Sequence, residues 1–169
     1  LSDYQLQSWD NVTAEARQLL AFDNVSTDDQ ILAYFYIGGA WKSQHNCDSA
    51  IASFKTVTRL TKSERGAEAR YDIAECLFLQ NNLKAAESAA FEVIKNTPSY
   101  DYWVAKAYIL LGDIYLKEND YFNATATYKS VADNATIPEL KKEAQDKLNA
   151  AIAQEQQNSK VETTPSDSQ

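Results

Sequence analysis

The chain has 169 residues, of which 44% are hydrophobic, and it contains only four glycines and three prolines. This is enough apolar sequence to bury a core but too little turn chemistry for a many-stranded sheet, so the composition predicts a mostly helical domain. The formal net charge of -8 argues against a nucleic-acid partner and against an anionic membrane surface, because such binding depends mainly on Lys and Arg. No stretch approaches the roughly 20 apolar residues of a membrane-spanning helix, so direct membrane insertion is not expected.

Hydrophobic periodicity predicts one helix at residues 4–22, followed by three pairs of helices and a last helix. Ala14 is the expected small packing residue of the first helix. The pairs are expected at 29–43 with 47–61, 65–80 with 83–96, and 101–118 with 121–133. Asp28, Asn46, Asn82 and Asp120 are the candidate N-caps or turn residues at the starts of these helices. The last helix, predicted at 138–157, is polar on most faces, as a terminal capping helix needs to be, and residues 159–169 are predicted to form a polar tail.

Small residues recur at a fixed spacing along the three predicted pairs. Gly38, Ala74 and Gly112 are each followed twelve residues later by an alanine, namely Ala50, Ala86 and Ala124. A glycine inside a helix costs about 1 kcal/mol relative to alanine, so Gly38 and Gly112 require a packing reason. We expect the two helices of each pair to cross closely at these residues. Four aromatic residues near them are expected to fill the space between neighbouring helices: Trp41, Phe54, Tyr115 and Tyr128. Tyr34 and Tyr108 each precede one of the glycines by four residues.

This order of aromatic, glycine, aromatic, alanine and aromatic residues, closed by Pro138 in the third copy, resembles the tetratricopeptide repeat. The resemblance implies an all-α, right-handed α-solenoid of helix-turn-helix repeats with a C-terminal capping helix. It divides the chain into a repeat domain at 1–158 and the tail at 159–169. Within the domain it implies a half repeat at 1–27, repeats at about 28–63, 64–99 and 100–137, and a capping helix at 138–158. The spacings of 36 and 38 residues exceed the 34 that is typical of the family.

The same resemblance implies a function and a site. The first helices of such repeats line a concave groove that binds a protein or peptide, so the chain is expected to be an interaction scaffold. By register, the partner-binding residues are Leu32, Phe35, Lys42, Glu68, Tyr71, Glu75, Phe78, Lys106, Ile109, Asp113 and Leu116, with Gly39 beside them. These side chains predict an aromatic and acidic groove that suits an apolar ligand with basic groups.

One subclass of the family clamps the carboxylate at the end of chaperone tails with Lys, Asn and Arg side chains. Here the matching positions hold Phe35, Gly39, Glu75 and Leu110, and only Lys106 agrees. Placing a ligand carboxylate beside Glu75 without a counter-charge would cost several kcal/mol. The sequence therefore predicts that the chain is not a receptor for chaperone tails.

No pattern in the sequence indicates catalysis, a metal or a cofactor, and none is expected. His45 is the only histidine and falls in a predicted turn, where we expect it to be exposed. Cys47 and Cys76 lack the spacing of metal ligands and are expected to be packing residues. There is no glycine-rich phosphate-binding loop and no His-Glu-x-x-His motif.

A second interpretation stays open beside the interaction scaffold. The repeats could serve as a structural spacer that self-associates through apolar residues at an open N-terminal end, such as Trp9 and Leu19. In addition, the stretches 99–107 and 120–124 are similar to the C-terminal part of large repeat proteins of Bacteroidetes-type bacteria. Those resemble Tol-Pal coordinating and outer-membrane-assembly lipoproteins. This similarity favours a periplasmic, outer-membrane-associated location, with the cytoplasm as the alternative.

Overall fold

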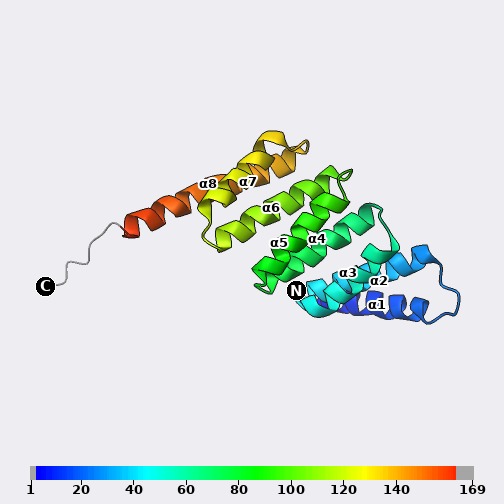
Figure 1. Ribbon diagram of the computed structural model, residues 1–169. Helices are drawn as coiled ribbons and strands as arrows, with labels where there is room; N and C mark the ends of the chain where they lie inside the picture. The colour runs from blue at the N-terminus through cyan, green and yellow to red at the C-terminus, as the bar shows by residue number, and fades with distance from the viewer. Residues whose placement is uncertain (1–2, 163–169) are drawn as a thin grey trace.

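The structure, a computed structural model, describes residues 3–162, which form eight helices and no strand (Figure 1). The helices are α1 (Asp3–Leu20), α2 (Thr27–Ser43), α3 (Cys47–Leu60), α4 (Glu64–Leu79), α5 (Leu83–Asn96), α6 (Asp101–Lys117), α7 (Tyr121–Asn134) and α8 (Pro138–Glu162). They stack in chain order, from α1 at one end to α8 at the other (Figure 1). The predicted all-α solenoid of helix-turn-helix repeats with a C-terminal capping helix is confirmed.

The helices alternate between two roles. The helices α2, α4 and α6 each pack on the following helix and also contact the next helix but one. Four alanines mark the same position in α2, α4, α6 and α8, and all are at most 2% exposed: Ala33, Ala69, Ala107 and Ala144. The helix α8 therefore occupies the place of a fourth first helix. We call α2, α4, α6 and α8 the first-type helices, and α1, α3, α5 and α7 the second-type helices.

The turn inside each pair has the same backbone conformation. His45, Asn81 and Asn119 follow α2, α4 and α6 and have a left-handed φ of about 60°. In the first of these turns the N–H of Asn46 donates to the carbonyl of Trp41 at 2.9 Å, and corresponding bonds close the other two turns. These bonds satisfy carbonyl groups that the end of a helix leaves free. As expected, His45 is exposed.

Two of the four predicted N-caps bond to the backbone as expected. The side chains of Asn46 and Asp120 accept hydrogen bonds from the backbone N–H groups of Ser49 and Asn123. Asn82 is also an N-cap residue, although its side chain does not bond there. The prediction of Asp28 is wrong, because Ser26 caps α2 by accepting from the N–H of Asp29 at 3.1 Å, so α2 begins two residues earlier than expected.

Gly38 and Gly112, both buried, lie where an aromatic ring of the second helix crosses the first. A Cβ atom on Gly38 would lie only 2.7 Å from Cε1 of Phe54, and one on Gly112 would meet the ring of Tyr128 even more closely. In the middle pair the equivalent positions hold Ala74 and Ala90, both fully buried. A glycine therefore faces an aromatic ring in the outer pairs, whereas two alanines share the same space in the middle one, which supplies the expected packing reason.

The first helix packs in a different register from the predicted one. Ala14 is exposed, and the buried small residue is Ala16, which packs in a cluster with Ala33 and Ile37 of α2. Ala16 precedes Ala50 by 34 residues, whereas Ala14 precedes it by 36, which is also the spacing from Ala50 to Ala86. The helix α1 thus packs on α2 as a second-type helix, two residues out of the expected register.

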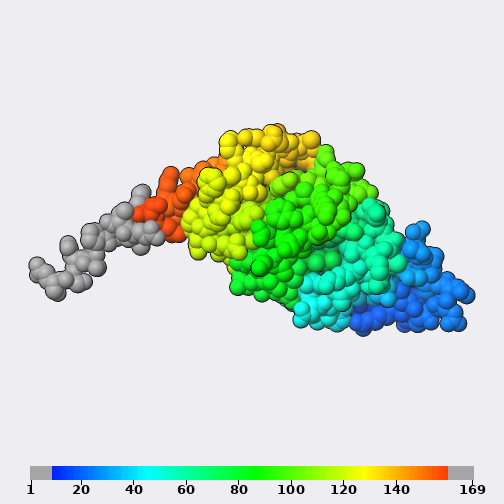
Figure 2. Space-filling model, in the orientation of Figure 1, coloured from blue at the N-terminus to red at the C-terminus, as the bar shows by residue number. Residues whose placement is uncertain are grey.

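The last helix is five residues longer than predicted and continues to Glu162. Residues 159–162 are therefore helical and do not begin the tail, because neither glycine nor proline occurs between Pro138 and Pro165. Gln154 and Asn158 donate hydrogen bonds to the Tyr121 hydroxyl, at 3.3 and 2.6 Å. Beyond Ala151 the described side chains are exposed, and the end of α8 projects from the stack (Figures 1 and 2). The rest of the predicted tail, 163–169, lies outside the described residues.

The two cysteines lie together in the core between the first pair of helices and α4. Cys47 and Cys76 are free thiols, 7% and 0% exposed, in one cluster with Phe54 and Val57. Burial raises the pKa of the Cys76 thiol well above its usual range. Both residues therefore pack as small apolar groups, as expected. Within the described chain, no helix has the length and hydrophobicity to cross a bilayer.

Candidate functional site: the first-helix face

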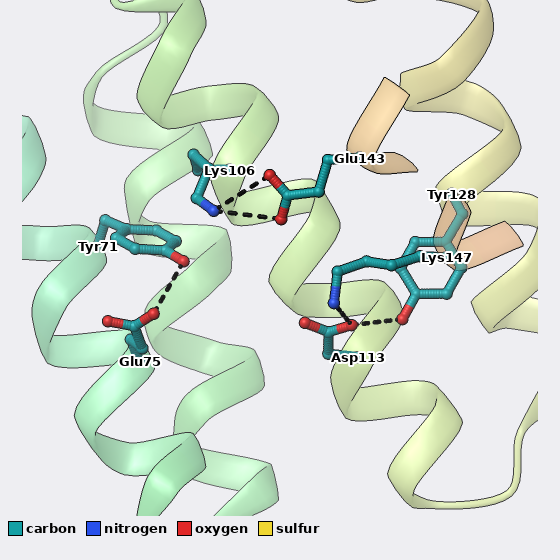
Figure 3. A network of polar contacts seen from close by, with 7 residues as sticks. All are labelled: Tyr71, Glu75, Lys106, Asp113, Tyr128, Glu143 and Lys147. Carbon is teal, nitrogen blue, oxygen red and sulfur yellow. Dashed lines mark hydrogen bonds and ion pairs between the residues drawn. The ribbon is translucent and has the colours of Figure 1, made fainter. Parts of the chain in front are cut away.

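The predicted partner-binding residues all lie on α2, α4 and α6, and we call the surface formed by the first-type helices the first-helix face. Side chains reach from each of these helices to the next, so the face is best described by its three junctions. Figure 3 shows residues of α4, α6, α7 and α8 that meet there.

At the junction of α2 and α4, one lysine meets two carboxylates. The Lys42 ammonium forms ion pairs with Asp72, at 2.5 Å, and with Glu75. Burial alone would lower the pKa of Lys42, but the two carboxylates outweigh burial and raise it above its usual value. Asp72 is more deeply buried and shares this ammonium with Glu75. Burial raises the pKa of Asp72, because its effect on this carboxyl group is larger than the opposite effect of the Lys42 charge.

The junction of α4 and α6 is built from cations over aromatic rings. The Lys106 ammonium lies 5.7 Å from the centre of the Tyr71 ring, and that of Lys117 lies 5.0 Å from the centre of the Phe78 ring. Tyr71 is only 6% exposed, and its hydroxyl donates to Glu75 at 3.3 Å (Figure 3). Its ring centre lies 5.6 Å from that of Trp103 in α6. Tyr71 is therefore a structural residue that leaves little surface for a ligand.

At the junction of α6 and α8, two ion pairs join the capping helix to the last repeat. Lys106 lies 3.3 Å from Glu143, and Asp113 accepts a 2.6 Å hydrogen bond from Lys147. The same Asp113 oxygen accepts a 2.6 Å bond from the hydroxyl of Tyr128, a fully buried side chain of α7 (Figure 3). Asp113 thus fastens α7 and α8 to α6.

These contacts change the charge that was expected of the groove, which the sequence predicted to be acidic. Glu75 and Asp113 are paired with lysines, so most of the predicted acidic charge is neutralised within the fold. Ile109 is 2% exposed and lies in the core formed with α7 and α8, against which Leu116 also packs. The helix α8 contacts both α6 and α7, and this coverage leaves Ile109 in the core and not on the surface.

Phe35, Glu68 and Phe78 are among the predicted residues that keep partly exposed side chains on the face, and they take no part in the ion pairs above. The Phe35 ring lies under the guanidinium of Arg65, 5.5 Å from its centre. Glu68 makes no ion pair with any described residue, in contrast to Glu75 and Asp113. Burial, and then the nearby charge of Asp72, raise the pKa of Glu68, and the charges of Arg65 and Lys42 offset this rise only in part. Its carboxylate would therefore be stabilised by an added cation.

Leu32 belongs to a different surface from the other predicted residues. It lines a hollow of about 490 Å³ between α1 and α2, together with Trp9, Val12, Glu15, Leu19 and Tyr36. A smaller hollow of about 220 Å³ lies between α6 and α7, where Tyr108 and Ile137 form part of its wall. In the described part of the chain, no three His, Cys, Asp or Glu side chains converge to hold a metal ion.

The sequence prediction missed the residues that form ion pairs with the predicted lysines and acids of the face. Asp72, Glu143 and Lys147 lie on the first-type helices α4 and α8 but were not among the predicted positions. Lys147 occupies in α8 the position of Asp72 in α4, counting from Ala144 and Ala69. Extending the repeat register into the capping helix would have found this residue, whereas the polar composition of 138–157 indicated only exposure to water.

We expect Asp113→Ala to lower the free energy of unfolding by about 1–2 kcal/mol, because it leaves the buried Tyr128 hydroxyl without its acceptor. Urea denaturation of Asp113→Ala, Tyr128→Phe and the double variant measures this coupling. In the Tyr128→Phe background the cost of Asp113→Ala should be smaller. An equal cost in both backgrounds would exclude the hydroxyl as its cause.

Comparison with known proteins bears on the family and on the fold. Residues 42–101 match the family model for the tetratricopeptide repeat. This segment contains α3, α4 and α5. The crystal structure of BtubC (BKLC) from P. vanneervenii has a TM-score of 0.67 at 12% identity, over 98% of this chain and 78% of that one. The crystal structure of MamA has a TM-score of 0.56 at 20% identity, over 90% and 91% of the two chains. No curated protein sequence matches the chain.

These likenesses are at low sequence identity and show the fold alone, a helical-repeat solenoid of the tetratricopeptide kind. A second structure, of MamA protein, has a TM-score of 0.51 at 19% identity, over 95% of this chain and 97% of that one. The matches give no support to the finer resemblance to Tol-Pal coordinating or outer-membrane-assembly lipoproteins. The periplasmic location inferred from that resemblance stays a prediction.

Proposed function

We propose that the chain is a non-catalytic scaffold that binds a protein segment on its first-helix face. The observation that carries this proposal is the partly exposed surface formed by the Phe35 ring of α2 and by the Glu68 carboxylate and the Phe78 ring of α4. The tetratricopeptide match at 42–101 includes α4, which supplies two of these three residues. Repeats of this family generally mediate interactions between proteins.

The ligand that suits this face is an apolar segment with a basic side chain. Glu68 is the carboxylate best placed to receive the basic group, because burial and Asp72 disfavour its charge more than Arg65 and Lys42 favour it, and it forms no ion pair with a described residue. A bound cation would lower the pKa of Glu68 again. Binding of a basic ligand should therefore weaken as the pH falls through the raised pKa of Glu68, because protonation removes the charge that attracts the ligand.

The same face is a poor receptor for a terminal carboxylate. Lys42 and Lys106 are the lysines that such a group would need, and both are already paired, Lys42 with Asp72 and Glu75 and Lys106 with Glu143. A ligand carboxylate would have to displace these acids and then lie close to them. This supports the prediction that the chain is not a carboxylate clamp.

Peptide binding tests this function. The probes are 12-residue peptides that contain Phe, Leu and two Arg residues, matched peptides with Glu in place of Arg, and both in C-terminal acid and amide forms. We expect the Arg peptide to bind, the Glu peptide to bind at least about tenfold more weakly, and the acid and amide forms to bind alike. Calorimetric titration measures the affinities.

Variants locate the binding. Phe35→Ala combined with Glu68→Gln should weaken the Arg peptide by about tenfold or more. Phe122→Ala is the matched control, because this ring is 80% exposed on the second-type helix α7. Tyr71 is avoided because its burial would confuse lost binding with lost stability. Equal affinities of the Phe35/Glu68 variant and the control for the Arg peptide would contradict the proposed face.

A further inference from the structure

The hollow between α6 and α7 lies within the solenoid, with described helices before and after it (Figure 1). It is bounded by the first half of α6, the second half of α7 and the turn that leads to α8, and its volume is about 220 Å³. Its apolar wall is formed by Val104, Ala105, Tyr108, Val131, Ala135 and Ile137. The hollow shares no residue with the predicted partner-binding set, because it lies on the side of α6 that faces α7.

Equivalent residues of the first pair explain why the hollow exists. Ala105 of α6 occupies the position of Ile31 in α2, two residues before the alanine that marks each first-type helix. Asn134 of α7 occupies the position of Leu60 in α3. Ile31 is 8% exposed and packs in one cluster with Leu60 and Val57. The third pair has a smaller side chain in place of the isoleucine and a polar one in place of the leucine, and this leaves a hollow.

The middle pair is closed at the same place, although its side chains there are also small. Ala67 occupies the position of Ala105 and is fully buried, and Thr97 occupies the position of Ala135 and is 2% exposed. The Thr97 hydroxyl donates a 2.6 Å hydrogen bond to the carbonyl of Val93. In the third pair, by contrast, Ala105 and Ala135 are partly exposed. The hollow is therefore a feature of the third pair and not of the repeat in general.

One carboxylate and one aromatic ring give the hollow its chemistry. Asp101 lies on its wall, accepts a 3.4 Å hydrogen bond from the Thr136 hydroxyl and makes no ion pair with a described residue. No lysine, arginine or histidine of the described residues lines the hollow. Tyr108 is 37% exposed, so part of its ring is open to a ligand. A bound cation would therefore meet a carboxylate and an aromatic ring, with no cation of the wall to oppose it.

The size of the hollow suits an aromatic ring. An apolar cavity of about 150 Å³ can hold a benzene molecule, and this hollow has about 220 Å³. We propose that the hollow between α6 and α7 binds an aromatic ring that carries a cationic amine. The ring lies against Val104, Val131 and Ile137, and the amine lies beside Asp101 and Tyr108. This site is independent of the proposed protein-binding function of the first-helix face.

Phenethylamine tests the proposal on the full chain, with phenethyl alcohol as the neutral ligand of the same shape. A titration followed by NMR should shift the backbone amide signals of Ala105 and Val131. We expect the amine to bind about threefold more tightly than the alcohol, and the two to bind alike to Asp101→Asn, because the variant lacks the charge. Equal binding of the two ligands to the parent chain, or no shift at these amides, would overturn the proposal.

Filling the hollow with the side chains of the first pair locates the ligand. Ala105→Ile with Asn134→Leu should weaken phenethylamine binding by about tenfold or more, because the new side chains occupy the space of the ring. Ala126→Ile is the matched control, since Ala126 is exposed on α7 and does not line the hollow. Circular dichroism shows whether each variant is folded, and if the filled variant is not, Asp101→Asn decides. Equal affinities of the filled variant and the control would overturn the proposal.

A dipeptide distinguishes two sources of the ring. Tighter binding of acetyl-Phe-Lys-amide than of phenethylamine supports a ring on the side chain of a protein, and weaker binding supports a free aromatic amine. Light scattering tests a second copy as the occupant: a parent dimer that becomes a monomer when the hollow is filled would overturn the proposal. The filled variant should still bind the Arg peptide of the first-helix face, so failure of either proposal is recognised separately.

Discussion

At pH 7, Lys42→Met is expected to lower the free energy of unfolding by about 3 kcal/mol relative to the parent protein. The methionine keeps the length of the side chain but removes the cation that Asp72 and Glu75 share. Breaking a buried ion pair by removing one partner costs about 3–5 kcal/mol, and the lower value applies because the Lys42 side chain is 26% exposed. Urea denaturation followed by circular dichroism measures the difference.

The pH dependence separates this electrostatic cost from lost packing. Without Lys42, the folded-state pKa of Asp72 rises further above its unfolded value. A carboxyl group with a raised folded pKa gains stability as the pH falls towards that value, because the neutral form no longer needs a counter-charge. The deficit of Lys42→Met relative to the parent should therefore shrink between pH 7 and pH 5.

The control for this variant is Lys129→Met. Lys129 pairs with Asp133 at 2.9 Å on the exposed surface of α7, where both side chains are more than half exposed. Such pairs contribute less than about 1 kcal/mol, so this variant should remain close to the parent protein at both pH values. A Lys42→Met deficit that stays constant from pH 7 to pH 5 would show that lost packing, and not unpaired carboxylates, causes it.

Alanine in place of Gly38 is expected to destabilise the protein by about 1–3 kcal/mol, although alanine is the better helix former. The new methyl group would lie 2.7 Å from Cε1 of Phe54 and 2.8 Å from its Cδ1. The Phe54 ring is fully buried and packs in one cluster with Ile31 and Val57. Relief of this clash requires the ring, or α2 and α3, to shift within that core.

The neighbouring glycine supplies a control with the opposite sign. A methyl group on Gly39 meets nothing within 4 Å, so Gly39→Ala should keep the packing and gain up to about 1 kcal/mol from helix propensity. Thermal and urea unfolding of both variants measure the difference between adjacent positions of one helix. A stabilising Gly38→Ala, or two variants of equal stability, would contradict the close crossing of α2 and α3.

The sequence was sufficient for the fold because the signals for its elements are local. Helix pairs follow from hydrophobic periodicity, and the close crossings at Gly38, Ala74 and Gly112 follow from a fixed spacing to an alanine in the next helix. The first helix was placed two residues out of register because Ala14 and Ala16 are equally small and only the contacts with α2 distinguish them. Such a choice depends on packing that periodicity does not contain.

The site could be predicted only in part, because its chemistry depends on pairs that are far apart in the sequence. The positions of Lys42, Lys106 and Asp113 on the first-type helices follow from the repeat register. Their partners are 30 or more residues away, as in the bonds of Lys42 to Asp72 and of Asp113 to Lys147. These partners decide which charges remain for a ligand, and among the predicted acids only Glu68 keeps its charge unpaired by any described residue.

The ion pairs between first-type helices also specify the order of the repeats. Asp72 in α4 and Lys147 in α8 occupy the same position relative to Ala69 and Ala144, yet they carry opposite charges. If α8 followed the first repeat directly, Lys42 would face Lys147 in place of Asp72, and two ammonium groups would share a partly buried site. The first and last junctions are therefore not interchangeable, because exchanging Asp72 for Lys147 would place like charges together.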